Sequence, residues 1–168
     1  MNKPITADYE ESTDEILSLL VPMASSKLIL PTVSVAEMVP YQPPKVRQNV
    51  TTQDTPEWYL GSLVWRGVLL PMMSYEALNG AVVASIRPES QLLILNSTGA
   101  TTEMPFFCFP TQGIPRLTRV VATEISENPE IIETATYEDM PVLVVNEAAV
   151  IPDIGKLECA VASLLGYI

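Results

Sequence analysis

Residues 56–80 read PEWYLGSLVWRGVLLPMMSYEALNG, and this stretch decides the fold class of the chain. From Trp58 to Tyr75 the only charged residue is Arg66. Apolar runs at 59–65 and 68–73 flank Arg66-Gly67. Each run has the length and β-rich composition of a strand, and the glycine supplies the positive φ that a tight reversal or bulge needs. The stretch therefore predicts a β-hairpin that reverses at Arg66-Gly67.

The first run of this hairpin has two different faces. Side chains alternate across a strand, so Leu63 and Trp65 fall on one side, and Ser62, Val64 and Arg66 fall on the other. We expect the side with Leu63 and Trp65 to face the core. The other side ends in a cation.

Two interpretations of Arg66 remain open from the residues alone. The guanidinium forms a structural ion pair with Glu37 or Glu57, or it serves to bind a partner. An exposed ion pair contributes only about 0 to 1 kcal/mol to stability. The bordering aromatic residues, Trp58 and Trp65 among them, are expected to pack in the core and not to form a ligand cage.

The rest of the chain predicts an all-β protein. Short apolar runs with Pro and Gly punctuation are typical of barrels or a sandwich. Strands are expected at 16–21, 27–30, 33–38, 81–86, 91–96, 104–109, 117–121 and 142–145. Residues 39–54 are expected to form a loop, residues 126–133 an acidic connection, and residues 1–15 a flexible acidic arm. Only Lys156 to Leu165 has the apolar stripe of a helix, with Gly166 just past its end.

Composition limits the classes of partner. Nine basic residues against twenty acidic ones give a formal net charge of −11, which repels phosphate backbones and anionic lipid heads. Nucleic acid is therefore not expected as a partner. Direct membrane insertion is not expected either, because no apolar run reaches the roughly 18 to 20 residues of a membrane span and the N-terminus lacks the apolar core of a signal peptide. We expect a cytoplasmic protein.

Chemistry-bearing residues are scarce. The chain has no histidine, which excludes Ser-His and Cys-His catalysis, histidine phosphotransfer and the commonest metal ligand. No glycine-rich loop for phosphate is present. The two cysteines, Cys108 and Cys159, are far apart in sequence and are expected to be buried free thiols. We therefore expect no catalytic residue, no metal, no cofactor and no enzymatic activity, although a Lys or carboxylate mechanism stays formally open.

The hairpin resembles the signature of a known family. The pattern P-x-x-x-x-G, then x-x-x-x-R-G-x-x-L-P, then a short helical segment closed by glycine is similar to that of the CheW family of chemotaxis coupling proteins. The matching positions are Pro56, Gly61, Arg66, Gly67, Leu70, Pro71 and 75–80. A weaker resemblance runs from residue 16 to the C-terminus, through 30–31, 33–38 and 141–146. Two dipeptides depart from the family pattern: Val64-Trp65 replaces Asn-Leu, and Ser74-Tyr75 replaces Asp-Leu.

The resemblance implies a fold. It predicts two intertwined five-stranded SH3-like β-barrel subdomains with a short C-terminal helix, as one CheW-like domain at 16–168. It also places Val35 and Glu37, on an edge strand, near Arg66.

The resemblance also implies a function. A non-enzymatic scaffold would link the cytoplasmic tip of a methyl-accepting chemoreceptor to the CheW-like regulatory domain of a CheA-like histidine kinase. By resemblance the receptor-binding residues are Val35, Glu37, Gly61, Val64, Arg66 and Gly67; no kinase-binding residue is assigned. Length, acidic character and the divergent centre are most similar to the ChpC-type coupling proteins of systems that control type IV pili and twitching motility. The alternatives are a generic SH3-like peptide-binding module and a small barrel enzyme using Lys or Asp/Glu.

Overall fold

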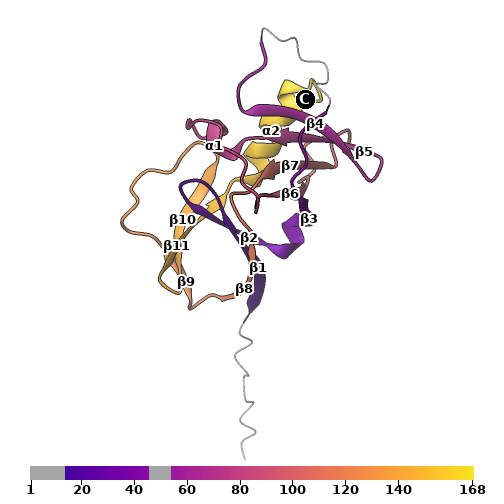
Figure 1. Ribbon diagram of the computed structural model, residues 1–168. Helices are drawn as coiled ribbons and strands as arrows, with labels where there is room; N and C mark the ends of the chain where they lie inside the picture. The colour runs from indigo at the N-terminus through magenta and orange to yellow at the C-terminus, as the bar shows by residue number, and fades with distance from the viewer. Residues whose placement is uncertain (1–13, 46–53) are drawn as a thin grey trace, which may run out of the picture.

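The computed structural model describes residues 14–45 and 54–168 (Figure 1). Of the arm predicted at 1–15, residues 1–13 lie outside the described residues. Glu15 belongs to the first strand. The strands are β1 (Glu15–Pro22), β2 (Lys27–Pro31), β3 (Val35–Pro40), β4 (Tyr59–Trp65), β5 (Val68–Met73), β6 (Gln91–Asn96), β7 (Phe106–Pro110), β8 (Arg116–Val121), β9 (Ile125–Glu127), β10 (Glu138–Val144) and β11 (Glu147–Pro152). A 3-10 turn η1 (Thr32–Ser34) and the helices α1 (Tyr75–Leu78) and α2 (Ile154–Leu164) complete the elements.

The strands form two sheets that share the chain in an intertwined order. The first sheet has the order β8-β1-β2-β11-β10-β9 and the second β3-β6-β7-β5-β4. The chain leaves the first sheet after β2, builds the second from β3 to β7, and returns at β8 (Figure 1). This confirms the predicted all-β class with its C-terminal helix. The first sheet has six strands, one more than expected, because the three-residue β9 adds to its edge.

Both sheets curl until their edge strands meet. In the second sheet β3 and β4 are the two edges, yet Trp65 on β4 donates a hydrogen bond to Glu37 on β3 at 3.0 Å. The chain after β3 also runs beside β4, because the Lys45 N–H donates to the Ser62 carbonyl at 2.9 Å. In the first sheet the edges β8 and β9 are joined by a tight turn, in which the Glu124 N–H bonds the Val121 carbonyl at 2.9 Å. Each sheet is therefore a small barrel.

Three apolar clusters fill the molecule. One lies inside the first barrel, one inside the second, and the largest lies between the barrels. On β2, Ile29 joins the first interior while Leu28 and Leu30 join the central cluster. On β6, even-numbered residues likewise face the second interior and odd-numbered residues the central cluster. Strands buried on both faces need apolar residues at every position, which explains the uninterrupted runs Leu28–Leu30 and Leu92–Leu95.

One predicted strand is wrong, and β11, like β9, is a strand that was not predicted from the sequence. Residues 81–86 are not a strand but an irregular segment, in which Val82 is 81% exposed. It is tied at Ala81, whose N–H bonds the Glu76 carbonyl, and at Ser85, whose carbonyl accepts from Gln112. In contrast, β11 was not expected, although it pairs with β10 and β2. It follows a two-residue turn at Val145 and Asn146, both with positive φ.

Helix α2 closes the fold against the central cluster. The Asp153 side chain caps its start by accepting from the Lys156 N–H at 3.0 Å, and Gly166 has the positive φ of a helix-terminating residue. Within the helix Leu157 and Val161 are fully buried. The predicted helix is confirmed and begins two residues earlier than expected. Cys159, expected to be buried, lies on its exposed side, whereas Cys108 is buried as predicted.

A fully buried carboxylate links α2 to the β6–β7 loop. Glu158 accepts hydrogen bonds from the Thr98 N–H at 2.6 Å, from the Ala100 N–H at 2.9 Å and from the Thr98 hydroxyl. Burial acts to raise the pKa of this carboxyl, but the hydrogen bonds outweigh burial and hold the pKa below its ordinary value. The carboxylate therefore stays ionised and stabilises the folded loop.

Replacing Glu158 by Gln should lower the free energy of unfolding at pH 7 by at least about 2 kcal/mol, because an amide cannot satisfy all these donors. The folded pKa lies below the unfolded one, so the stabilisation is complete above about pH 4.5 and disappears as the pH falls through the folded pKa. Urea unfolding at several pH values should show the two proteins converging in acid. Glu103→Gln, at an exposed position of the same loop, is the control and should match wild type. An E158Q deficit that persists in acid would contradict this account.

Candidate partner-binding site

The turn of the β4–β5 hairpin holds Arg66 in a fixed direction. Trp65 pairs with Val68, so the loop contains only Arg66 and Gly67, whose φ values are 49° and 77°. Positive φ at both central residues defines a type I′ turn, whose twist matches that of the flanking strands. The predicted hairpin is confirmed, and Arg66 itself adopts the left-handed conformation that only glycine and a few other residues favour.

Arg66 forms an ion pair across the barrel edge. Its Nη2 lies 3.0 Å from Oε2 of Glu37, with 68% of the Arg66 side chain and 33% of the Glu37 side chain exposed. The indole Nε1–H of Trp65 donates to the same oxygen at 3.0 Å. Of the two acidic partners considered from the sequence, Glu37 is therefore the one in contact. The bond from Trp65 orients its carboxylate.

The Trp65 ring supports the guanidinium from below. Cζ of Arg66 lies 5.0 Å from the centroid of the ring, within the range of a cation–π contact. The ring packs edge to face on Phe106, with centroids 5.1 Å apart and planes at 78°. Trp65 was expected in the core beside Leu63. It is only partly buried and packs on the rim of the second barrel, where it contacts Glu37 and Arg66 as well as the core.

The six residues assigned by resemblance fall into two groups. Glu37, Val64, Arg66 and Gly67 lie at or beside the hairpin tip, and Val64 is 64% exposed. Val35 instead packs against the central cluster, because a register irregularity between Val35 and Glu37 sends the two side chains to different faces.

Gly61 and Ser62 do not belong to the exposed tip. Gly61 is buried further along β4 at a second irregularity, with a φ of 117°. Ser62, expected on the outer side with Val64, is also buried, and its hydroxyl shares a 3.0 Å hydrogen bond with that of Tyr59. Trp65 and Phe106 are the members of the tip that residue patterns missed, because a large apolar residue in a strand is normally assigned to the core.

The first barrel has two chemically different ends. Along β1, Ile16 pairs with Val120 at one end and Leu20 pairs with Arg116 at the other. At the Ile16 end the barrel opens into a cavity of about 340 Å³. Its lining is almost entirely apolar: Ile16, Ile29, Pro31, Val120, Val121, Ala122, Ile125 and Ile151, with Asp14 and Ser18. We call these residues the open apolar end.

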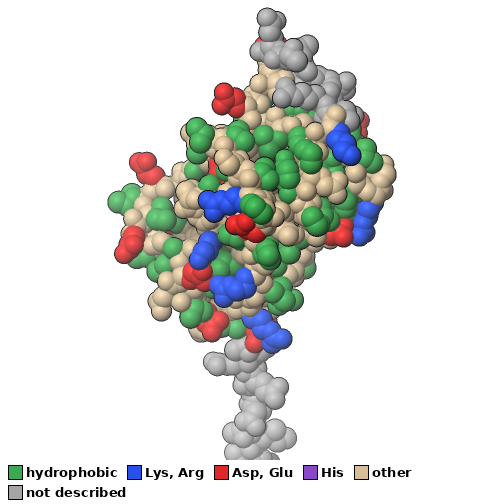
Figure 2. Space-filling model, in the orientation of Figure 1, with side chains coloured by type: hydrophobic (Ala, Val, Ile, Leu, Met, Phe, Trp, Pro, Cys, Tyr) green, Lys and Arg blue, Asp and Glu red, His purple; other side chains and the backbone are tan. Residues whose placement is uncertain are grey.

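The opposite end is closed by charges. Glu147 binds Lys27 and, at 2.7 Å, the Nη2 of Arg116. The Lys27 hydrogen bond, with Arg116 beside it, holds the pKa of the Glu147 carboxyl below its ordinary value. On the face in Figure 2, Lys and Arg side chains lie next to Asp and Glu side chains, and further Asp and Glu side chains lie apart from them.

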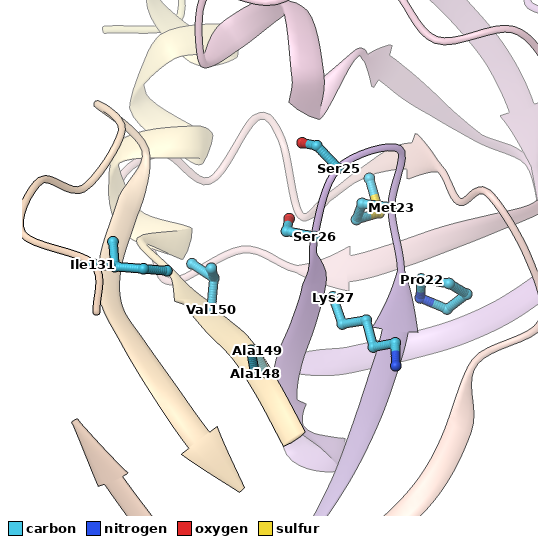
Figure 3. A pocket seen from close by; sticks show the side chains of 9 residues that line it. All are labelled: Pro22, Met23, Ser25, Ser26, Lys27, Ile131, Ala148, Ala149 and Val150. Atoms are coloured by element: carbon cyan, nitrogen blue, oxygen red, sulfur yellow. The ribbon is translucent and has the colours of Figure 1, made fainter. Parts of the chain in front are cut away.

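A groove of about 400 Å³ lies beside this closed end (Figure 3). The turn between β1 and β2 forms one wall, and Ile131 with Ala148–Val150 the other. Its one lysine, Lys27, forms an ion pair with Glu147. The described residues contain no cluster of three Cys, Asp or Glu that could hold a metal ion. Within residues 14–45 and 54–168 no helix has the length and apolarity to cross a membrane.

Replacing Gly67 by Ala should lower the free energy of unfolding by about 1–2 kcal/mol. A Cβ there meets no atom within 4 Å, so the cost would come from the positive φ alone. Gly155→Ala is the matched control: its Cβ makes ordinary contact 3.6 Å from Asp153, and Ala favours the helix, so stability should hold or rise. Equal effects of the two substitutions in urea unfolding would argue against the type I′ turn.

Comparison with known proteins identifies the family. A model of the CheW-like domain matches residues 18–158, which is most of the chain. The fold is also similar to the crystal structure of the scaffolding protein TtCheW from Thermoanaerobacter tengcongensis, with a TM-score of 0.63 and 14% identity over 82% of this chain and 88% of that one. A comparison with curated protein sequences returns no match. The chain belongs to the CheW-like domain family.

Proposed function

We propose that the chain is a non-enzymatic scaffold that couples a methyl-accepting chemoreceptor to a CheA-like histidine kinase. Its membership of the CheW-like family supports the general role. The observation that carries the proposal is the exposed Arg66 guanidinium, oriented by Glu37 and Trp65 at a hairpin tip where it does little for stability. An exposed ion pair contributes about 0 to 1 kcal/mol to folding, so a fully built arginine site is better explained by binding.

The receptor side of the scaffold comprises Val35, Glu37, Gly61, Val64, Arg66 and Gly67. Glu37, Val64, Arg66 and Gly67 are the proposed contact residues, because they are at the tip. Val35 and Gly61 act indirectly. The strand register shifts beside each of them, and these shifts determine which face of β3 or β4 the neighbouring side chains occupy. The partner surface is the helical cytoplasmic tip of the receptor, which would place apolar side chains on Val64 and an oxygen on Arg66.

The kinase side is the open apolar end of the first barrel. An apolar opening of this kind suits the regulatory domain of a kinase that itself has a CheW-like fold. The open apolar end belongs to the first sheet and the Arg66 tip to the second, so the two partners would occupy separate surfaces. Both could then bind at once.

The pathway we propose is a ChpC-type one, which controls twitching motility by type IV pili, with the protein acting in the cytoplasm. The acidic charge and the departures at Trp65 and Ser74 support this choice. A strain that lacks the protein should lose normal twitching while retaining assembled pili. Normal twitching with impaired swimming would instead assign it to a flagellar system.

Arg66→Ala should weaken capture of the chemoreceptor tip by more than about tenfold, because a desolvated arginine at an interface is worth at least about 2 kcal/mol and 1.4 kcal/mol is a factor of ten. The thermal midpoint should stay within a few degrees, since Ala and Arg bear a similar cost of positive φ. Kinase binding should persist. Arg87→Ala, at another exposed arginine, is the control. Receptor binding at wild-type strength, or an unfolded variant, would show that Arg66 is structural.

Ile16→Ser should weaken binding of the kinase regulatory domain by more than about tenfold and leave receptor capture intact. Ile16 is 54% exposed at the open apolar end, so its loss removes apolar contact area without emptying the core. Ile132→Ser, at a 94% exposed isoleucine away from that end, is the matched control. If both variants bind the kinase domain equally well, the kinase side lies elsewhere.

Experiment distinguishes the scaffold from two alternative functions. A generic SH3-like peptide-binding module would bind extended peptides but would not co-purify with a receptor or kinase. A small barrel enzyme would need a free lysine or carboxylate. Recovery of both signalling proteins in a pull-down from the native cell supports the scaffold, and turnover of ATP above buffer by the purified protein would count against it.

A further inference from the structure

We propose that Trp65 is a positioning residue that joins Glu37 and Arg66 into one unit, and that this unit binds a neutral oxygen on its partner, a carboxamide or backbone carbonyl, and not a carboxylate. The inference rests on the proposed receptor-binding role of Arg66. It adds the chemistry of the ligand, and assigns a role to Trp65.

The three side chains of the unit form a closed set of contacts. One oxygen of Glu37 receives the indole N–H of Trp65 at 3.0 Å and lies 3.0 Å from Nη2 of Arg66. The same indole ring lies 5.0 Å below Cζ of the arginine. Each of the three side chains thus contacts the other two. Phe106 holds the indole from behind by an edge-to-face contact at 5.1 Å.

This arrangement orders the arginine side chain before a partner binds. An arginine on a flexible surface loses side-chain entropy when a partner immobilises it. Here the type I′ turn sets the backbone at φ 49°, the indole ring lies against the guanidinium and Glu37 pairs with its Nη2. A leucine at position 65 would supply neither the ring nor the N–H donor. Trp65 therefore supplies two of the contacts that orient Arg66, one through its ring and one through Glu37.

The charge around Arg66 favours a neutral ligand over an anionic one. Glu37 already neutralises Arg66, and the whole chain carries a net charge of −11. An incoming carboxylate would have to compete with Glu37 for the guanidinium and would gain no attraction from the surrounding protein. A neutral oxygen can instead accept from the other guanidinium N–H groups while Glu37 stays in place. With 68% of the arginine side chain exposed, those donors are accessible.

The unit itself can be tested without any partner. The chain has two tryptophans, so Trp58→Phe leaves Trp65 as the only one. In that background, Arg66→Ala should increase acrylamide quenching of Trp65 fluorescence, because one ring face loses its cover. Arg87→Ala should not. Unchanged quenching in the Arg66 variant would overturn the unit, whatever the partner is.

The ligand chemistry is tested by titrating a soluble fragment of a chemoreceptor cytoplasmic tip at 50 and 300 mM NaCl. For a neutral oxygen, wild-type affinity should change less than about threefold between the two salts. Glu37→Gln should weaken binding, because the arginine loses its orientation. Trp65→Phe should weaken binding about three- to tenfold without changing the urea midpoint, and Arg66→Lys should weaken it more, since an ammonium lacks the planar fork.

Opposite results separate the two levels of the proposal. Tighter binding by Glu37→Gln, with steep salt dependence, would mean a carboxylate ligand and overturn the neutral oxygen. If the Trp65→Phe variant binds the receptor fragment as tightly as wild type, Trp65 is not a positioning residue. The Arg66→Ala variant tests the receptor-binding role of Arg66 separately. A further outcome is that the wild-type protein shields Trp65 with Arg66 in the quenching experiment and yet fails to bind the receptor fragment. That result would overturn both the proposed receptor binding and the proposed neutral ligand, and would support only the contacts among Glu37, Trp65 and Arg66.

Discussion

The fold depends on the apolar cluster between the two barrels, because both barrels are incomplete without it. Strands β1, β2, β6 and β7 each place alternate residues inside a barrel and in this shared cluster. Helix α2 adds Leu157 and Val161 to the same cluster. Each fully buried aliphatic side chain is worth about 1.5–3 kcal/mol, so separating the barrels would expose more apolar surface than either interior could offset. The two barrels therefore form one cooperative unit.

This double-sided burial determines what could be predicted from the sequence. The β4–β5 hairpin was predictable because its turn is local: Arg66-Gly67 permits two positive φ values between two apolar runs. Helix α2 was predictable from its stripe and its terminal glycine. The segment 81–86 has strand composition, but it belongs to neither of the two described sheets, and strand pairing is a tertiary property. The strand β11 was missed because its turn places Val145, a β-branched residue, at a φ of 48°.

The candidate site was predictable in part, for a similar reason. The proximity of Glu37 and Arg66 came from the family resemblance, since 29 positions of sequence separate them and nothing local joins them. Trp65 was assigned to the core because alternation cannot indicate where a strand leaves the core and reaches the rim. The placements of Val35 and Gly61 depend on strand irregularities, which change the side on which later residues fall. Such irregularities have no reliable signal in a single sequence.

The positions of the two proposed surfaces have a consequence for how such a scaffold can change. The Arg66 tip and the open apolar end both lie where strands leave a barrel, whereas the shared cluster lies between the barrels. A substitution at a barrel end alters the chemistry offered to a partner and leaves the cooperative core intact. Trp65 lies at such a position, because its ring packs on the rim and contacts Glu37 and Arg66. In this chain the proposed partner surfaces are therefore separate from the apolar cluster that holds the two barrels together.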